Sequence, residues 1–169
     1  MKHIIQIHLE HKKDVIREIE IPSEKTLKDL HYAIIKSLDL ETNEMASFYM
    51  TNEEFDLIQE IPLFVIDEKE KSIKTMDEVT IDAILNEHDD KLIYIYDFLK
   101  MWRFLISFIK TSNEKSKSIN ITNKEGEMPK ETAELVFESK KEFNDWEQDI
   151  DENLETRDYL SNASNDSFY

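Results

Sequence analysis

Residues 4–21 carry a two-residue hydrophobic alternation that is interrupted once, by the polar residues 11–14. Successive side chains of a strand point to opposite faces of a sheet, so this period indicates two half-buried strands, at residues 4–10 and 15–21. The polar interruption predicts a hairpin turn between them. Pro22 should end the second strand, because proline cannot donate a hydrogen bond to a neighbouring strand.

The hydrophobic period changes to that of a helix in residues 26–40. One face of this helix collects the residues Leu27, Leu30, His31, Ile34 and Leu38. Thr26 and Asp29 have the spacing of a capping box, in which each residue satisfies a backbone N–H of the other. We therefore expect the helix to begin just after Thr26.

Weaker patterns follow this helix. Residues 46–51 and 63–66 are typical of strands, and residues 77–85 favour a short helix with its aliphatic side chains inward. These assignments rest on few residues each.

The most apolar window, residues 91–110, has three charged residues near its middle: Asp97, Lys100 and Arg103. Each would cost about 2.5 to 3.5 kcal/mol in a membrane, which excludes a transmembrane helix. The β-branched and aromatic content favours two strands, residues 92–96 and 102–109, joined by a turn. A helix from Phe98 onward is the alternative, because residues 98–109 do not alternate strictly.

These elements predict an α+β domain with a mixed sheet over residues 1–110, whose hairpin-then-helix opening is similar to a β-grasp. Residues 111–169 are expected to form an acidic extension with a helix near residues 130–154 and a disordered end. An apolar stripe lies along that helix, at Phe143, Trp146, Ile150 and Leu154. Such a stripe either docks on its own domain or enters a groove of a partner.

The composition excludes several classes of protein. The chain has no cysteine, which removes disulfides, thiol catalysis and the sulfur ligands of structural zinc, and its single glycine excludes glycine-rich phosphate loops. The net charge of -17 opposes direct binding to nucleic acid. We find no metal-ligand spacing, catalytic triad or signal peptide, so we expect a cytoplasmic protein without a metal or cofactor.

Residues 94–102 read YIYDFLKMW, which resembles the signature of the plasmid pRiA4b ORF-3-like family: Tyr, any residue, Tyr-Asp-Phe-Gly-Asp, any residue, Trp. The resemblance covers about residues 3–110, and residues 124–129 (KEGEMP) resemble a later Gly-Glu-x-Pro. Leu99 and Lys100 replace the family's Gly-Asp, and its Trp-Arg-Arg and His-Leu-His read Ile16-Arg17-Glu18 and Glu44-Met45-Ala46. The resemblance implies an α+β domain without an established biochemical role. Members are sometimes labelled passenger proteins of insertion elements.

The residues that match the signature and its surroundings form the candidate site: Arg17, His31, Tyr94, Tyr96, Asp97 and Trp102. Asp97 at the start of a turn can accept hydrogen bonds from nearby backbone N–H groups. Arg17 can pair with it if the first hairpin lies beside the later strands. Two interpretations stay open, a structural pair that fixes the turn and a ligand site. His31 is likewise either a core histidine or a functional one.

We weigh three functions from different classes. The first is a non-catalytic module that binds a protein partner, because the chain is acidic and lacks catalytic motifs. The second, suggested only by the family's labels, is an accessory role in mobile-element DNA transactions through a basic partner or by charge mimicry. The third is an enzyme with a small pocket around Arg17, His31 and Asp97. The oligomeric state is not indicated.

Overall fold

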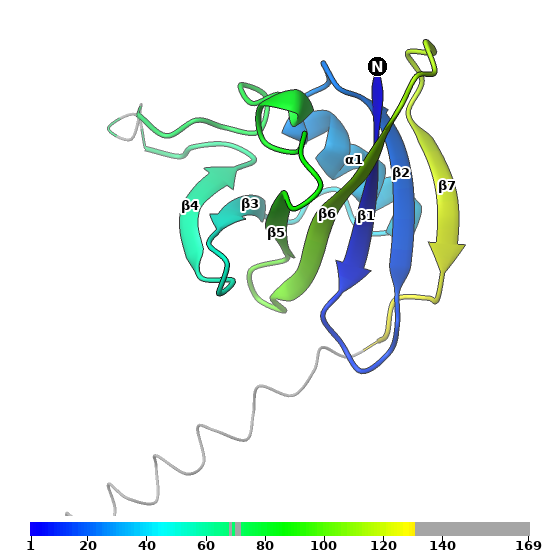
Figure 1. Ribbon diagram of the computed structural model, residues 1–169. Coiled ribbons are helices and arrows are strands. Elements are labelled where there is room, and N and C mark those ends of the chain that lie inside the picture. Colours follow the sequence, from blue (N-terminus) through cyan, green and yellow to red (C-terminus); the bar gives the residue numbers. More distant parts are fainter. Residues whose placement is uncertain (68, 70–71, 131–169) are drawn as a thin grey trace, which may run out of the picture. The chain divides into compact units, whose positions relative to one another are not determined.

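The computed structural model describes residues 1–67, 69 and 72–130. Within these residues the strands are β1 (Lys2–Leu9), β2 (Ile16–Pro22), β3 (Ala46–Thr51), β4 (Leu57–Pro62), β5 (Lys91–Tyr96), β6 (Trp102–Ser112) and β7 (Asn120–Glu125). They form one sheet in the order β4-β3-β5-β6-β1-β2-β7 (Figure 1). The helix α1 (Leu27–Leu38) packs on one face of the sheet, and a short 3-10 helix, η2 (Ile81–Ala83), follows later in the chain.

The two alternating runs at the start of the chain pair with each other. β1 and β2 are antiparallel, with Ile5 opposite Ile19, and β6 lies on the other side of β1. α1 begins after Thr26, where both bonds of the predicted capping box are present. It ends at Asp39, whose left-handed backbone (φ 54°) closes the helix.

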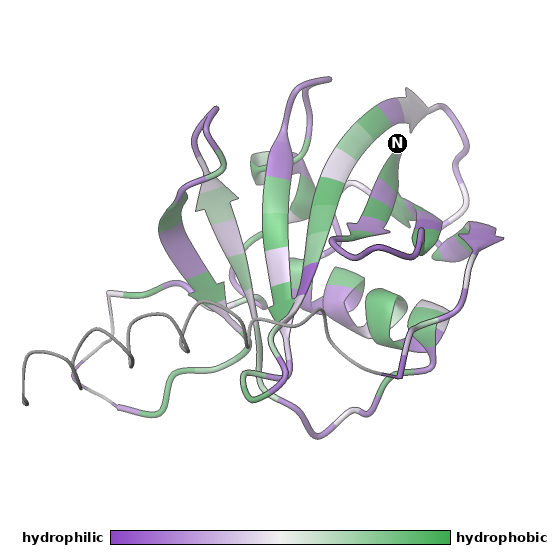
Figure 2. Ribbon diagram, turned by 90° about the horizontal axis from the view of Figure 1, so that it is seen from below, coloured by the Kyte–Doolittle hydropathy of each residue, from purple (hydrophilic) through white to green (hydrophobic). Residues whose placement is uncertain are grey.

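The apolar core of the described residues lies between α1 and one face of the sheet. β6 shows how the sequence produces it: Trp102, Phe104, Ile106 and Phe108 are buried at alternate positions, and the residues between them are only half-buried. Figure 2 shows hydrophobic residues recurring along the strands and on the helix. Burying each of these large side chains contributes about 1.5 to 3 kcal/mol.

The apolar window of residues 91–110 forms β5 and β6, joined by a turn at residues 97–101. The prediction of two strands is confirmed, and the alternative of a helix from Phe98 is wrong. No helix in the described part of the chain combines the length and the apolar character needed to cross a membrane.

The predicted fold class is wrong, because the sheet is not mixed and is not β-grasp-like. All six strand pairings in the described part of the chain are antiparallel. β1 has two antiparallel neighbours, β2 and β6, so no parallel pair is formed at the centre of the sheet. Hydrophobic alternation shows which face of a strand is buried but carries no information on strand direction.

Three local predictions also need correction. The strand expected at residues 63–66 lies earlier, as β4, whose first four residues are exposed and therefore show no apolar period. The short helix expected at residues 77–85 is reduced to η2 and turns. β7 was not anticipated at all, because it is a polar edge strand of sequence NITNKE.

The predicted helix at residues 130–154 and its apolar stripe fall almost wholly outside the described residues, which end at Lys130. In the described part of the predicted extension, β7 pairs with β2 and so completes the sheet of the N-terminal part. The domain boundary after Lys110 stays a prediction.

Candidate functional site

His31 and Tyr94 meet in the core between α1 and β5. His31 Nδ1 lies 2.7 Å from the Tyr94 hydroxyl, and both side chains are fully buried. The Tyr94 ring also packs against Phe48 and Phe104. Nε2 of His31 has no hydrogen-bond partner among the described residues, which makes it an uncompensated polar atom in the core.

Burial determines the protonation of this pair. It lowers the pKa of His31 to about 4, with a smaller contribution from the charge of Lys28. Burial also raises the pKa of Tyr94 well above its usual range. At neutral pH the imidazole is therefore neutral and the phenol protonated. Neither group is exposed to a substrate, so the geometry is that of a core hydrogen bond.

Arg17 on β2 is a buried arginine whose hydrogen-bond partners, among the described residues, are all backbone carbonyl groups. Its Nε donates to Ser37 O at the end of α1 at 2.8 Å. Its terminal nitrogens donate to Ile16 O at 2.7 Å, Glu125 O at 2.8 Å and Gly126 O at 2.9 Å. Burial lowers its pKa, while the carboxylates of Asp39 and Glu127 oppose that shift. Arg17 thus ties α1 and the end of β7 to β2.

Gly126 shows how closely the chain packs at this point. Its backbone has a φ of 71°, and a Cβ atom would lie 2.1 Å from Asp14 O. Only glycine fits there without moving the backbone of the β1–β2 turn. The chain's single glycine therefore supplies one of the four carbonyl groups that Arg17 binds.

The remaining signature residues fix the turn between β5 and β6. The Tyr96 hydroxyl donates to Glu41 O at 2.7 Å, and burial, followed by the charges of Glu44 and Asp97, raises its pKa to about 12. Asp97 is buried, and its Oδ1 accepts from the backbone N–H groups of Leu99 at 3.1 Å and Lys100 at 3.2 Å. Trp102 is buried at the start of β6.

The turn itself has an unusual backbone. Asp97 and Met101 have φ values of 58° and 55°, a left-handed conformation that costs L-residues about 1 to 2 kcal/mol each. Met101 N donates to Asp97 O at 2.6 Å, and Asp97 N donates to Met45 O at 2.8 Å. Such a conformation persists only where its surroundings impose it. The turn is therefore a fixed structure.

Apolar side chains project from this fixed turn. Leu99 is 95% exposed, and Phe98 and Met101 are also exposed, at 37% and 45%. These three residues, together with Lys100, are referred to below as the turn tip. Leu99 and Lys100 are the two positions at which the sequence departs from the Gly-Asp of the signature.

Substitution of Asp97 tests its role in holding the turn. Asp97→Ala should lower the free energy of unfolding by about 1 to 2 kcal/mol, because two backbone N–H groups lose their acceptor. Asp97→Asn keeps an acceptor oxygen and tolerates the left-handed backbone, so it should lose less than about 1 kcal/mol. Urea denaturation of both variants measures the difference. Equal losses would show that the side-chain oxygen does not hold the turn.

The three residues proposed for a small pocket are not joined. Arg17 contacts the ends of α1 and β7, His31 contacts Tyr94, and Asp97 contacts its own turn. Among the described residues, no hydrogen bond or ion pair connects any two of the three. Each of the three residues instead forms hydrogen bonds with a separate set of groups.

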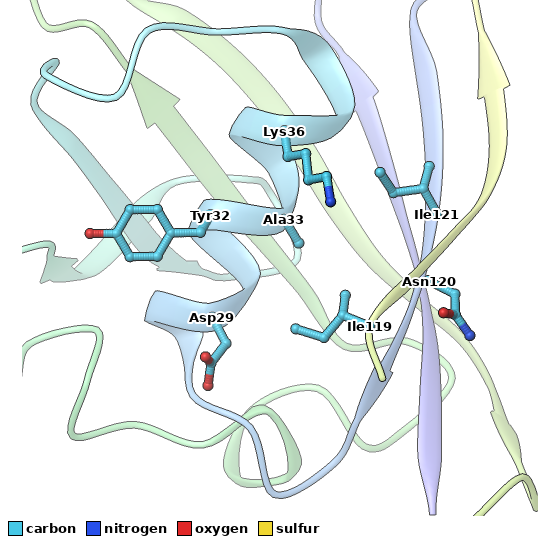
Figure 3. A pocket seen from close by; sticks show the side chains of 7 residues that line it. All are labelled: Asp29, Tyr32, Ala33, Lys36, Ile119, Asn120 and Ile121. Atoms are coloured by element: carbon cyan, nitrogen blue, oxygen red, sulfur yellow. The ribbon is translucent and has the colours of Figure 1, made fainter. Parts of the chain in front are cut away.

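A groove of about 470 Å³ lies elsewhere, between α1 and β7. It is lined by Asp29, Tyr32, Ala33, Lys36, Ile119, Asn120 and Ile121. In Figure 3 the side chains of Ala33, Ile119 and Ile121 face the space between the two elements, while the ring of Tyr32 extends on the other side of the helix. This groove is hard to recognise from the sequence, since Ile119 and Ile121 are isolated in a polar segment.

Sequence reasoning also missed a polar network at the opposite end of β1 from the turn tip. Lys2 is fully buried, and its Nζ lies 3.4 Å from Glu20 Oε2. His3 joins two further elements, with Nε2 at 3.1 Å from Asp82 Oδ1 and Nδ1 at 3.3 Å from Thr111 Oγ1. A lysine at the second position gives no sequence signal of burial.

Comparison with known proteins gives two findings. A family model described as plasmid pRiA4b ORF-3-like protein matches residues 2–168. Among solved structures, a protein of unknown function from Methanosarcina mazei Go1 is similar, with a TM-score of 0.61 and 18% sequence identity. That match covers 73% of this chain and 68% of the other, and at this identity it concerns the fold alone. No curated protein gives a significant match.

Proposed function

This chain belongs to the plasmid pRiA4b ORF-3-like family, and we propose that it is a non-catalytic protein-interaction module whose contact surface is the turn tip. The single observation that supports this most is the exposure of Phe98, Leu99 and Met101 on a turn that hydrogen bonds of Asp97 hold in place. Exposed apolar side chains that cluster on a fixed backbone mark interaction sites more often than scattered ones do.

Pre-ordering is the property that makes the turn tip suitable for binding. A contact residue held in one conformation before binding loses little conformational entropy when the complex forms. Asp97, Tyr96 and Trp102, which match the signature, are buried and support the turn. Leu99 and Lys100, which depart from it, are exposed. The supporting residues thus follow the signature, while two residues of the turn tip, Leu99 and Lys100, depart from it.

Charge around the turn tip indicates the kind of partner. The neighbouring β1–β2 turn approaches β6 through the hydrogen bond from Glu10 N to Arg103 O, at 2.9 Å. This turn carries Lys12 and Lys13, which are exposed like Lys100. The same turn carries Glu10, which is paired with Arg103, and Asp14, so the lysines fit carboxylates on only part of the border of a partner's apolar pocket.

The test uses the tagged full-length protein and its Leu99→Asp variant. Proteins are captured from a lysate of the source cell with each, and a captured protein is then purified and titrated by calorimetry. We expect Leu99→Asp to weaken binding at least about tenfold, because a charge replaces the central apolar contact. Its stability should stay within about 0.5 kcal/mol of the unsubstituted protein, since Leu99 is on the surface.

The matched control is Ile66→Asp, which places the same charge at another exposed aliphatic residue, 82% exposed. It should bind the partner as the unsubstituted protein does. If both variants weaken partner binding equally, or if neither weakens it, the assignment of binding to the turn tip is contradicted.

Electrophoretic shift assays with duplex DNA separate this proposal from direct action on DNA. We expect no shift even at low salt, because the net charge of -17 repels the phosphate backbone. A shift that weakens steeply as salt is added would favour the mobile-element hypothesis in its direct form.

A further inference from the structure

We propose that the groove between α1 and β7 binds an acidic amphipathic helix of a partner protein, with Lys36 pairing with one of its carboxylates. This surface differs from the turn tip, so either proposal can fail without the other. Three observations carry it: the apolar floor of the groove, its position alongside a helix, and the charge on its border.

The floor of the groove is apolar and has room for large side chains. Ala33 is the small residue at its base, with Ile119 and Ile121 on the β7 side. Both isoleucine side chains, that of Ile119 just before β7 and that of Ile121 within it, face the groove (Figure 3). A groove of about 470 Å³ is within the range of volumes that bind ligand groups. Apolar side chains entering it would contact Ala33, Ile119 and Ile121, while the polar residues Asp29, Lys36 and Asn120 also line the groove.

The shape of the groove favours a helix as the occupant. It runs alongside α1 and is bordered by residues one turn apart on that helix, from Asp29 through Ala33 to Lys36. A helix lying in an apolar groove inserts side chains at every third or fourth position, which match such a row. A strand added to β7 would instead bind the backbone at the edge of the sheet and leave the groove empty.

The charges on the border select an acidic occupant. The Asp29 carboxylate is already bound, since Oδ2 accepts from Thr26 N at 3.0 Å and Thr26 Oγ1 at 3.1 Å. Lys28 is paired with Asp77 at 3.9 Å. Lys36 has no ion pair among the residues that the structure describes. Its ammonium group is thus the cationic end of the groove, while Asp29 keeps its negative charge, bound to Thr26, at the other end of the row.

The net charge of the chain does not prevent this contact. At physiological ionic strength, charges separated by more than about 8 Å are largely screened. The contact of a carboxylate with Lys36 is therefore governed by local charge, while the distant carboxylates mainly slow association. A basic partner would meet Lys36 as a like charge.

The probe is a synthetic helical peptide with leucine and tryptophan at every third and fourth position and glutamate elsewhere. A second peptide has lysine in place of each glutamate. Amide NMR spectra of the full-length protein are recorded during titration with each. We expect the acidic peptide to shift the signals of α1 and of residues 119–121, and the basic peptide to bind at least about tenfold more weakly.

Two substitutions locate the contact. Lys36→Glu should weaken binding of the acidic peptide about tenfold, whereas Lys13→Glu, the same charge change in the β1–β2 turn, should leave it within about twofold. Ile121→Ser should also weaken binding, with circular dichroism confirming that the variant is folded. Leu99→Asp should bind the peptide normally, which separates this site from the turn tip.

Several outcomes would overturn the proposal. Binding of the basic peptide as tightly as the acidic one would contradict it. Shifted NMR signals that lie away from α1 and β7 would also contradict it. Equal effects of Lys36→Glu and Lys13→Glu would remove Lys36 from the contact. If sedimentation shows a dimer that Lys36→Glu dissociates, the groove belongs to a second copy of the chain instead.

Discussion

Arg17→Ala is expected to lower the free energy of unfolding by about 3 to 5 kcal/mol, the largest loss from any single substitution considered. Arg17 is 6% exposed and donates to four backbone carbonyl groups, on β2, α1 and the end of β7. Removing the guanidinium leaves these acceptors without a donor in a buried region. Since domains of this size are stable by about 5 to 15 kcal/mol, the variant should be close to unfolding. Urea denaturation measures the change.

Two further arginine variants make this prediction specific. Arg17→Lys keeps the charge, but a single ammonium cannot reach carbonyl groups spread around a planar guanidinium, so it should lose about 2 kcal/mol or more. Arg103→Ala removes a half-exposed arginine whose Nε lies 2.9 Å from Glu10 Oε2, and it should lose at most about 1 kcal/mol. A loss below about 1 kcal/mol for Arg17→Ala would contradict the role of Arg17.

Hydrogen exchange shows which part of the sheet is destabilised in Arg17→Ala. In Arg17→Ala the amides of β7 should exchange earlier than those of β1 and β6, because Arg17 holds the chain just beyond β7. Uniform acceleration across the sheet would mean that the substitution destabilises the whole core instead of this edge.

The elements that the sequence predicted well are those that bury one face, so that their own side chains alternate between apolar and polar. The alternation in residues 4–21 and the helical spacing after Thr26 identified β1, β2 and α1, because each buries one face against the core. The two strands around Asp97 were recognisable for the same reason. Local pattern is informative where burial repeats with the period of the element.

β4 and β7 were missed for a common physical reason. Both are edge strands, so each has one unpaired side and little burial, and their sequences lack an apolar period. Their positions are decided by pairing with β3 and β2. Strand direction was mispredicted because it depends on connections across the sheet, which no single segment encodes.

For the candidate site, the sequence identified which residues are special but not what they contact. Asp97 was expected to bind backbone N–H groups of its turn, and it does. Arg17 was a possible partner of Asp97 if the first hairpin lay beside the later strands, but it binds carbonyl groups contributed by α1 and β7. Because β7 was not predicted, the true partners of Arg17 could not be named. The groove beside β7 was hidden for the same reason.

The second large effect is a loss of stability in acid that originates at His31. Burial lowers its pKa from 6.5 to about 4 in the folded protein. Between these values the unfolded chain binds a proton that the folded chain does not, so stability falls as pH falls. The stability that depends on a neutral His31 is fully present above about pH 6.5 and is lost progressively toward about pH 4. Its full size is on the order of 3 kcal/mol.

His31→Gln isolates this contribution, because glutamine does not titrate and still offers an acceptor to the Tyr94 hydroxyl. Between about pH 7.5 and about pH 5, the unsubstituted protein should lose about 2 kcal/mol more than the variant. Carboxylates that titrate in both proteins cancel in this comparison. NMR titration of the imidazole should show no protonation down to about pH 5. Two results would contradict this prediction: an imidazole that titrates near its unperturbed pKa, or equal losses of stability in both proteins. Either would mean that the charged form of His31 is tolerated in the folded protein, so that His31 and Tyr94 are not shielded from water.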